Sequence, residues 1–148
     1  MAQTTRGLSG AAGTLSARIN STGTFSDISG SSQSVETVTL TRITGEAYTL
    51  EGNYALLTFG KIEPAEVKVN VIYTEATTEA TMLLQGAWES DQVVELKWTP
   101  AGSEASADTY TTSAGKITAM DLPALDASSA GPIMCSFTLR VASITHAT

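Results

Sequence analysis

The acidic residues that could carry out acid–base or metal chemistry do not have a spacing that suits either. Glu75 and Glu79 lie four residues apart in a segment with helical periodicity, so they could share one helix face as paired carboxylates. Carboxylates near a helix N-terminus more often stabilise the helix dipole. Asp121 and Asp126 flank a loop, but they lack the repeated Asp spacing of a calcium loop and a histidine cluster. We therefore predict neither a catalytic pair nor a metal site.

The only cysteine, Cys135, is predicted to be a buried residue and not a nucleophile. A catalytic thiol needs a nearby histidine and an electropositive setting, and the only histidine of the chain is His146. Cys135 lies in an alternating apolar run at residues 133–141, where a free cysteine packs as a small hydrophobic side chain. The glycines form no phosphate-binding or dinucleotide-binding pattern, and there is no nucleophile elbow. The sequence thus predicts no enzymatic activity and no cofactor.

The two tryptophans could form an aromatic platform for a sugar ring. Trp88, however, falls on the apolar stripe of a predicted helix, and Trp98 falls on the apolar face of a predicted strand. Both positions indicate packing in the core, so we predict that neither tryptophan binds a ligand.

The composition indicates one folded domain with few charges on its surface. Of the 148 residues, 42% are hydrophobic and only 16% are charged, which is below the usual charged share. A surface poor in ions loses its water easily, which favours a subunit of an assembly. The net charge of −7 and the scattered Lys and Arg residues argue against nucleic-acid binding, although DNA could pass without sticking. We recognise no membrane-spanning run and no secretory leader, so we expect no membrane partner and folding in a cytoplasm.

The hydrophobic periodicity predicts about seven strands and one helix, which is a mainly β fold. Strands are expected at residues 14–19, 35–43, 66–73, 93–98, 109–112, 116–122 and 133–144. One amphipathic helix is expected from about residue 76 to residue 88, with Thr74 or Thr77 as its cap. We divide the single domain into an N-terminal arm and first strand at residues 1–34 and a β-rich body at residues 35–148. Residues 1–10 are expected to be a mobile arm.

A long apolar loop separates two of the predicted strands, at residues 44–64. Its large apolar side chains are Tyr48, Leu50, Tyr54, Leu56, Leu57 and Phe59. Loops of about 20 residues without structure of their own are uncommon in compact domains and are usually functional. Because apolar side chains need cover, this loop either forms a twisted hairpin that packs on its own domain or docks onto another subunit.

Several sequence runs in a fixed order give the chain a resemblance to a known family. They are GEAYT, LTFGK, PAEV and YTE between residues 45 and 75, then a predicted helix, LKWTP, YTTSAGKIT and DASSAGP. In order and character these runs, which span about residues 27–144, resemble the major tail tube proteins of siphophages.

The resemblance implies a β-sandwich or half-barrel with one flanking α-helix, six copies of which close into a ring with a continuous inner β-barrel. Stacked rings would form the tail tube of the virion, a conduit with an electronegative channel through which genome DNA passes without specific binding. Residues 45–63 would make the contacts between subunits and between rings, with residues 1–10 and 145–148 as further contacts. Other tail proteins, such as terminator, tape measure and tail tip, would be partners. Assembly would take place in the host cytoplasm.

Two other functions stay open from the sequence. A surface-binding module for carbohydrate or adhesion would use exposed aromatic side chains, for which Tyr48, Tyr54 and Phe59 are the candidates. A head–tail completion or decoration protein would instead form a ring that does not elongate.

Overall fold

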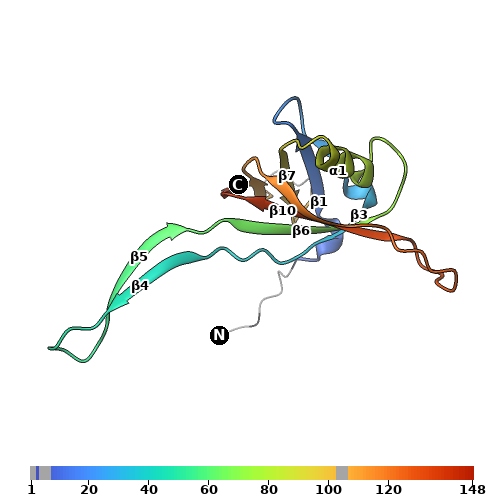
Figure 1. Ribbon diagram of the computed structural model, residues 1–148. Coiled ribbons are helices and arrows are strands. Elements are labelled where there is room, and N and C mark those ends of the chain that lie inside the picture. The colour runs from blue at the N-terminus through green and yellow to red at the C-terminus, as the bar shows by residue number, and fades with distance from the viewer. Residues whose placement is uncertain (1–2, 4–7, 103–106) are drawn as a thin grey trace.

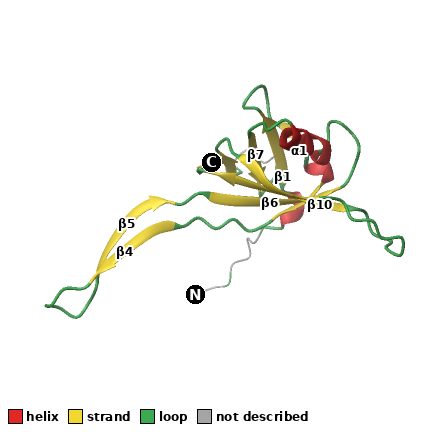
Figure 2. Cartoon of the chain, viewed as in Figure 1, coloured by secondary structure: helices red, strands yellow, loops and turns green. Residues whose placement is uncertain are grey.

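Two packed β-sheets and a helix make up the body of the protein, and a β-hairpin projects far from it (Figure 1). The computed structural model of the chain describes residues 3, 8–102 and 107–148. One sheet has five strands in the order β11-β8-β7-β1-β2, and the other has four in the order β3-β6-β10-β9. The hairpin is a separate two-stranded sheet, β4-β5. Strands dominate the cartoon in Figure 2, which confirms the predicted mainly β fold.

The elements follow one another with mostly short connections. In chain order they are η1 (Gly10–Ala12), β1 (Thr14–Ile19), β2 (Ser26–Asp27), η2 (Ser29–Ser31), β3 (Ser32–Val35), β4 (Arg42–Ala47), β5 (Leu56–Ile62), β6 (Ala65–Ile72), α1 (Ala80–Glu89), β7 (Val94–Thr99), β8 (Thr109–Thr112), β9 (Lys116–Asp121), β10 (Met134–Val141) and β11 (Ile144–Ala147). Within the described residues there are thus eleven strands, more than the seven expected, and one α-helix as expected.

Alternating side chains of β6 and β10 form the centre of the core. Their buried residues lie opposite one another in register, as Val67 with Leu139, Val69 with Phe137 and Val71 with Cys135. Directly paired residues of antiparallel strands share one face of the sheet, so these six side chains pack together against the other sheet. The predicted burial of Cys135 is confirmed, and this burial raises the pKa of its thiol.

The helix α1 begins later than predicted, and its cap comes from elsewhere. The N-cap residue is Glu79, which has extended backbone angles and whose side chain does not cap the helix. The backbone N–H of Ala80 instead donates to the hydroxyl of Ser31 in η2 at 3.0 Å. The predicted caps Thr74 and Thr77 are therefore wrong, because a hydroxyl from a distant segment takes their place.

The late start of α1 also changes the position of two carboxylates considered above. Glu75 and Glu79 both precede the first helical residue, so the expected placement four apart on one helix face is wrong. Glu75 accepts a hydrogen bond from the hydroxyl of Tyr73 at 3.2 Å, and its negative charge is the main reason that the pKa of Tyr73 is raised.

The two tryptophans differ in burial. Trp98 packs against the core and stacks on Tyr110 with ring centroids 5.8 Å apart, as predicted for a strand-face residue. Trp88 is 43% exposed, so its predicted place in the core is wrong. The buried stripe of α1 already consists of Ala80, Thr81, Leu84 and Ala87, and Trp88 follows Ala87 by about 100° around the helix.

The prediction of one continuous strand at residues 35–43 is wrong, because the structure has no strand in the middle of this segment. β3 ends at Val35 and β4 begins at Arg42, and residues 36–41 between them belong to neither. The backbone N–H of Glu36 still donates to the carbonyl of Lys68 at 2.9 Å, after which the chain leaves the four-stranded sheet. Alternating Thr and apolar residues favour an extended backbone, but a strand also needs a neighbouring strand to which its backbone groups can hydrogen-bond.

The predicted final strand, residues 133–144, is two strands that belong to different sheets. β10 pairs with β6 and β9, whereas β11 pairs with β8 in the five-stranded sheet. Residues 142–143 carry the chain from one sheet to the other. At the opposite end of the chain, β1 pairs with β7 along its whole length. It also pairs with β2 on its other side, so it is an interior strand of the five-stranded sheet.

Candidate self-assembly interface

The β4–β5 hairpin, residues 42–62, is the part of the structure with the least cover from the rest of the chain. Its strands pair with each other, as Glu46 with Leu57 and Ala47 with Leu56, and a bulge lies between Arg42 and Thr44. Figure 1 shows that the hairpin extends from β6 away from the body as one curved ribbon. The predicted loop is therefore a hairpin, and it does not pack on its own domain within the described residues.

The six apolar residues predicted for this segment are all exposed. The least exposed is Leu56 at 58%, and Leu50 at the tip is fully exposed. Side chains alternate along a strand, so Leu57 and Phe59 share one face of the hairpin and Leu56 lies on the other. Contiguous exposed apolar residues of this kind mark an interaction surface or an aggregation liability. The hairpin thus presents apolar side chains on both faces and at the tip.

Three more exposed apolar residues at the base of the hairpin were not among those predicted. They are Leu40, Ile43 and Ile62. The prediction of one strand at residues 35–43 hides the first two, because it assigns both to the body of the protein. The apolar surface consequently extends from the tip of the hairpin down to its base.

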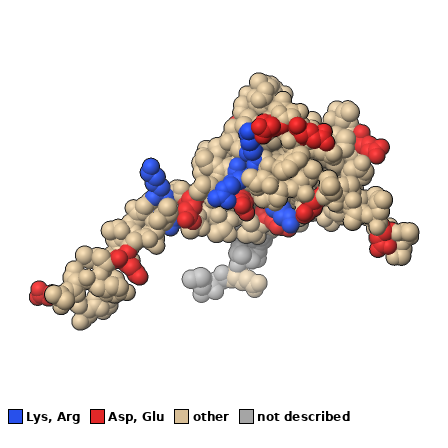
Figure 3. Space-filling model, viewed as in Figure 1, with Lys and Arg blue, Asp and Glu red and all other residues tan. Residues whose placement is uncertain are grey.

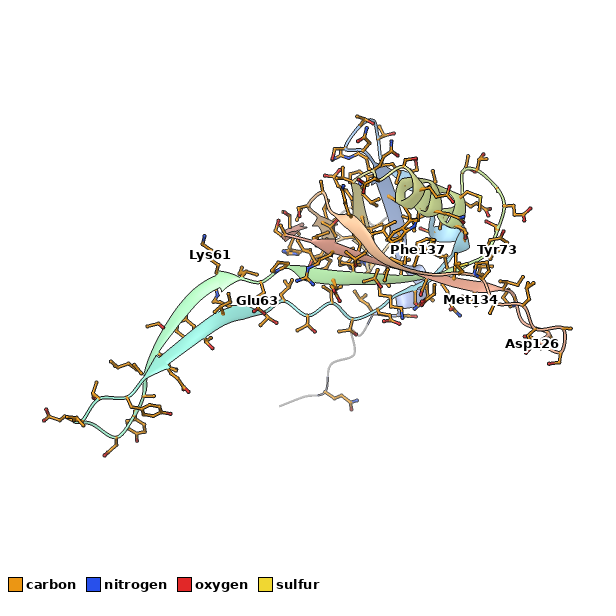
Figure 4. All side chains as sticks on the ribbon, in the orientation of Figure 1. Lys61, Glu63, Tyr73, Asp126, Met134 and Phe137 are labelled. Atoms are coloured by element: carbon orange, nitrogen blue, oxygen red, sulfur yellow. The ribbon has the colours of Figure 1, made fainter. Side chains whose placement is uncertain are left out.

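A second projection, the loop at residues 122–133, lies on the opposite side of the body (Figure 4). Its residues Leu122 and Leu125 are exposed, and Asp126 lies at its tip. The carboxylate of Asp126 accepts hydrogen bonds from the hydroxyl and the backbone N–H of Ser128, and these bonds lower its pKa. The molecule therefore has apolar projections on two opposite sides.

The structure offers no support for a metal site at the two aspartates considered above. Asp121 accepts a hydrogen bond from Ser136 at 2.5 Å within the four-stranded sheet, whereas Asp126 lies in the projecting loop. Among the described residues, no group of three or more His, Cys, Asp or Glu side chains could hold a metal ion. Likewise, no helix in the described part of the chain is long and apolar enough to cross a bilayer.

The open edges of the two sheets are further surfaces for assembly. Within the described residues, β3 and β9 are the outermost strands of the four-stranded sheet, and β11 and β2 those of the five-stranded sheet. An outermost strand presents backbone N–H and C=O groups that can pair with another chain. A groove of about 640 Å³ also lies beside β3, and its lining includes Val35, Val38, Trp98 and Tyr110.

The outer face of the four-stranded sheet is polar. On β6 it carries Glu66, Lys68 and Asn70, which alternate with the buried valines. Asn70 donates to the hydroxyl of Ser34 at 3.0 Å and to the carboxylate of Glu36 at 3.2 Å. Figure 3 shows acidic and basic side chains interspersed on the visible surface of the body, which is otherwise largely uncharged.

No protein-family model and no curated protein matches the chain in sequence. Solved structures do resemble it. A chain in the six-fold symmetrised cryo-EM structure of the anti-feeding prophage baseplate superposes with a TM-score of 0.77 at 14% identity, covering 98% of this chain and 97% of that one. A chain of the extended PVC sheath–tube complex, an extracellular contractile injection system, gives a TM-score of 0.68 at 15% identity and covers 90% of this chain and 88% of its own.

The SPP1 tail tube, a hybrid structure from solid-state NMR and cryo-EM, gives a TM-score of 0.64 at 13% identity. It covers 95% of this chain and 78% of that one. Similar chains thus come from a phage tail tube and from a contractile injection system, so the fold is not confined to siphophages. The chain has the fold that these tail and injection-system proteins share.

Proposed function

We propose that this protein is a structural subunit that assembles into stacked hexameric rings, which form the tail tube of a phage or phage-like particle. The observation that carries the proposal is the β4–β5 hairpin, whose exposed apolar residues have no cover within the described chain. The similar chains from a six-fold symmetric baseplate and from a tail tube support it. A head-to-tail interface between identical copies closes into a ring, and a second such interface repeats along the axis.

The four-stranded sheet is our candidate for the inner wall of the ring. Joining the open edge of β9 in one copy to the open edge of β3 in the next would extend the sheet around the ring and remove both edges. The buried face of this sheet packs in the core, so its polar outer face would line the channel. Genome DNA would then pass this face without a specific binding site.

The two opposite projections are suited to contacts between rings. An interface that repeats along an axis needs different surfaces on the two sides of the subunit. The hairpin with Tyr48, Leu50, Tyr54, Leu56, Leu57 and Phe59 lies on one side, and the loop with Leu122 and Leu125 lies on the other. Of the terminal contacts that the resemblance implies, residues 145–147 lie in β11, whereas most of residues 1–10 lie outside the described chain.

The remaining parts of the proposal follow from the same role. The protein would act without catalysis or a cofactor, as one domain with an N-terminal arm and first strand at residues 1–34 and a body at residues 35–148. Its partners would be further copies of itself and the terminator, tape measure and tail-tip proteins. It would reside in the tail of the virion after assembly in the host cytoplasm. The sequence resemblance favours a siphophage.

Removal of the hairpin tip tests the role of the hairpin. We expect the purified protein to form rings or tubes in negative-stain images, and a variant in which Gly-Ser replaces residues 48–55 to fold normally but not to stack. Circular dichroism and thermal unfolding verify the fold of the variant. Long tubes formed by this variant would refute the stacking role.

A carbohydrate-binding or adhesion module is the second candidate, because Tyr48, Tyr54 and Phe59 are all exposed as that function requires. A glycan array with the full chain separates the two functions. Binding of a sugar that the Tyr48→Ala and Tyr54→Ala variants lose, by a protein that stays monomeric at high concentration, would favour the binding module.

A further inference from the structure

The outer face of the four-stranded sheet carries two of its cations in ion pairs. Arg140 of β10 lies directly opposite Glu66 of β6, and its Nη1 donates to Oε1 of Glu66 at 3.1 Å. Lys116 of β9 is in register with Arg140 on the other side, and its Nζ contacts Oδ1 of Asp91 at 3.0 Å. Each of these two cations therefore has a carboxylate partner.

The third cation of this face, Lys68, forms no ion pair within the described residues, but Glu36 lies opposite it. The backbone N–H of Glu36 donates to the carbonyl of Lys68 at 2.9 Å, which places Glu36 opposite Lys68 directly after the end of β3. The side chain of Glu36 accepts a hydrogen bond from Asn70 at 3.2 Å, and Asn70 follows Lys68 on the same face of β6. The amide thus holds the Glu36 carboxylate over this face.

This face carries cations as well as carboxylates. Its cations are Lys68, Lys116 and Arg140, the carboxylates on its strands are Glu66 and Asp121, and two more carboxylates, Glu36 and Asp91, lie next to it. The whole chain carries a net charge of −7, so most of its excess of carboxylates lies on other surfaces. A face with three cations differs from the electronegative channel that the family resemblance implies.

We propose that Glu66 is a shielding residue, which keeps Arg140 from binding the phosphates of a nucleic acid that moves along this face. The inference rests on the proposed function, which places the face on the channel. A free arginine pairs with phosphate through two parallel hydrogen bonds, and each phosphate that is neutralised releases a counterion from DNA. Channel-lining cations without partners would therefore hold the DNA that must pass.

Repetition in the ring makes the effect of one residue large. One unpaired arginine per copy gives six in a hexameric ring. A protein that makes about 6–10 phosphate contacts loses about 10³–10⁵-fold in DNA affinity when the salt concentration rises from 50 to 200 mM. As a stabilising contact, by contrast, the pair counts for little, because both side chains are about half exposed. Loss of the pair should thus change DNA binding far more than folding.

The test is the binding of a short linear DNA duplex to assembled protein, measured by co-sedimentation at about 50 and 200 mM salt. We expect Glu66→Gln to bind the duplex at least about tenfold more tightly than the unchanged protein at low salt, and to lose this gain at high salt. The control Glu89→Gln makes the same charge change at the end of α1, where Glu89 accepts a hydrogen bond from Gln85, and should leave binding unchanged.

A double variant and a second DNA make the result decisive. Glu66→Gln with Arg140→Gln should return to the binding of the unchanged protein, because it leaves no free cation at this pair. Equal DNA binding by Glu66→Gln and Glu89→Gln in normal tubes would overturn the shielding role. If Glu66→Gln fails to assemble, Glu66→Ala takes its place with the same expected gain and the same overturning result.

A covalently closed DNA circle of the same sequence separates this inference from the proposed function. A circle has no end and cannot enter a tube, so a gain confined to the linear duplex supports both the shielding and the channel. An equal gain with the circle would support the shielding and refute the placement of this face inside the channel.

Discussion

The hydroxyl of Ser31 accepts a hydrogen bond from the backbone N–H of Ala80 at 3.0 Å, although the two residues are 49 positions apart in the chain. A helix leaves its first N–H groups without internal partners, and a local side chain usually satisfies one of them. Here the partner of the Ala80 N–H comes from η2, a segment that is distant in sequence. The bond ties the start of α1 to the segment that leads into β3, and both residues are buried.

Ser31→Ala should consequently destabilise the protein. It removes a helix cap and leaves a buried N–H without its partner, so we expect a loss of about 1–2 kcal/mol in the free energy of unfolding. Urea unfolding followed by circular dichroism measures the loss. The control Ser90→Ala, at the other end of α1, removes an exposed hydroxyl and should change stability by less than about 0.5 kcal/mol. Equal effects of the two changes would contradict a capping role for Ser31.

Two substitutions on α1, one on its buried side and one on its exposed side, should differ in how much they lower the free energy of unfolding. Leu84 is only 2% exposed, so Leu84→Ala should lower the free energy of unfolding by about 2–5 kcal/mol through lost burial and a cavity. Trp88 is larger but 43% exposed, so Trp88→Ala should cost clearly less than Leu84→Ala. Chemical unfolding of both variants under one set of conditions checks the order. A larger loss with Trp88→Ala would mean that Trp88 packs in the core after all.

Polar substitutions in the hairpin should affect assembly but not folding. Leu57 and Phe59 are exposed and lie on the same face of β5, so replacing both by Ser should change the melting temperature of the monomer by no more than a few degrees. The loss of two apolar contacts per copy should shorten or abolish tubes in electron micrographs. The matched control is Lys61→Ser, on the same strand but charged. Tubes of unchanged length from the double variant would exclude this face of the hairpin from the contact.

Stability should fall with rising pH in a way that depends on Cys135. Burial raises the pKa of its thiol in the folded state. As the pH rises past the ordinary thiol pKa, the unfolded chain loses this proton while the folded chain keeps it, so the unfolded state gains stability. Unfolding free energies measured at pH 8 and pH 10 should therefore decrease more in the unchanged protein than in Cys135→Ala. Identical decreases in both proteins would show that other groups cause the whole effect.

Much of the fold could be predicted from the sequence where side chains alternate between core and solvent. In β6 and β10, successive residues alternate between the core face and the outer face; β6 lies within one residue of its predicted bounds, and β10 begins one residue after its predicted start. The apolar residues of the candidate interface were also visible, because Tyr48 to Phe59 form a cluster too apolar for an ordinary surface loop. These features depend on the local order of residue types, which the sequence contains in full.

Other features depended on which distant segments meet. Residues 36–41 have the residue types of a strand yet form none, because the pairing with β6 ends with β3. Trp88 lies outside the core because smaller residues of α1 already fill the space against the sheet, and Ser31 replaces the predicted caps because η2 packs beside Ala80. The pairing of Arg140 with Glu66 likewise exists only because β10 and β6 are neighbours in this register.

The sequence by itself therefore determined the mainly β character, the buried strand faces and the apolar composition of the projecting segment. Only the tertiary structure decided that this segment is a hairpin standing clear of the body, and that Arg140 and Glu66 of the four-stranded sheet form an ion pair. The physical reason is that alternation and propensity act between near neighbours in the chain. Exposure and charge pairing, in contrast, depend on contacts between residues far apart in sequence.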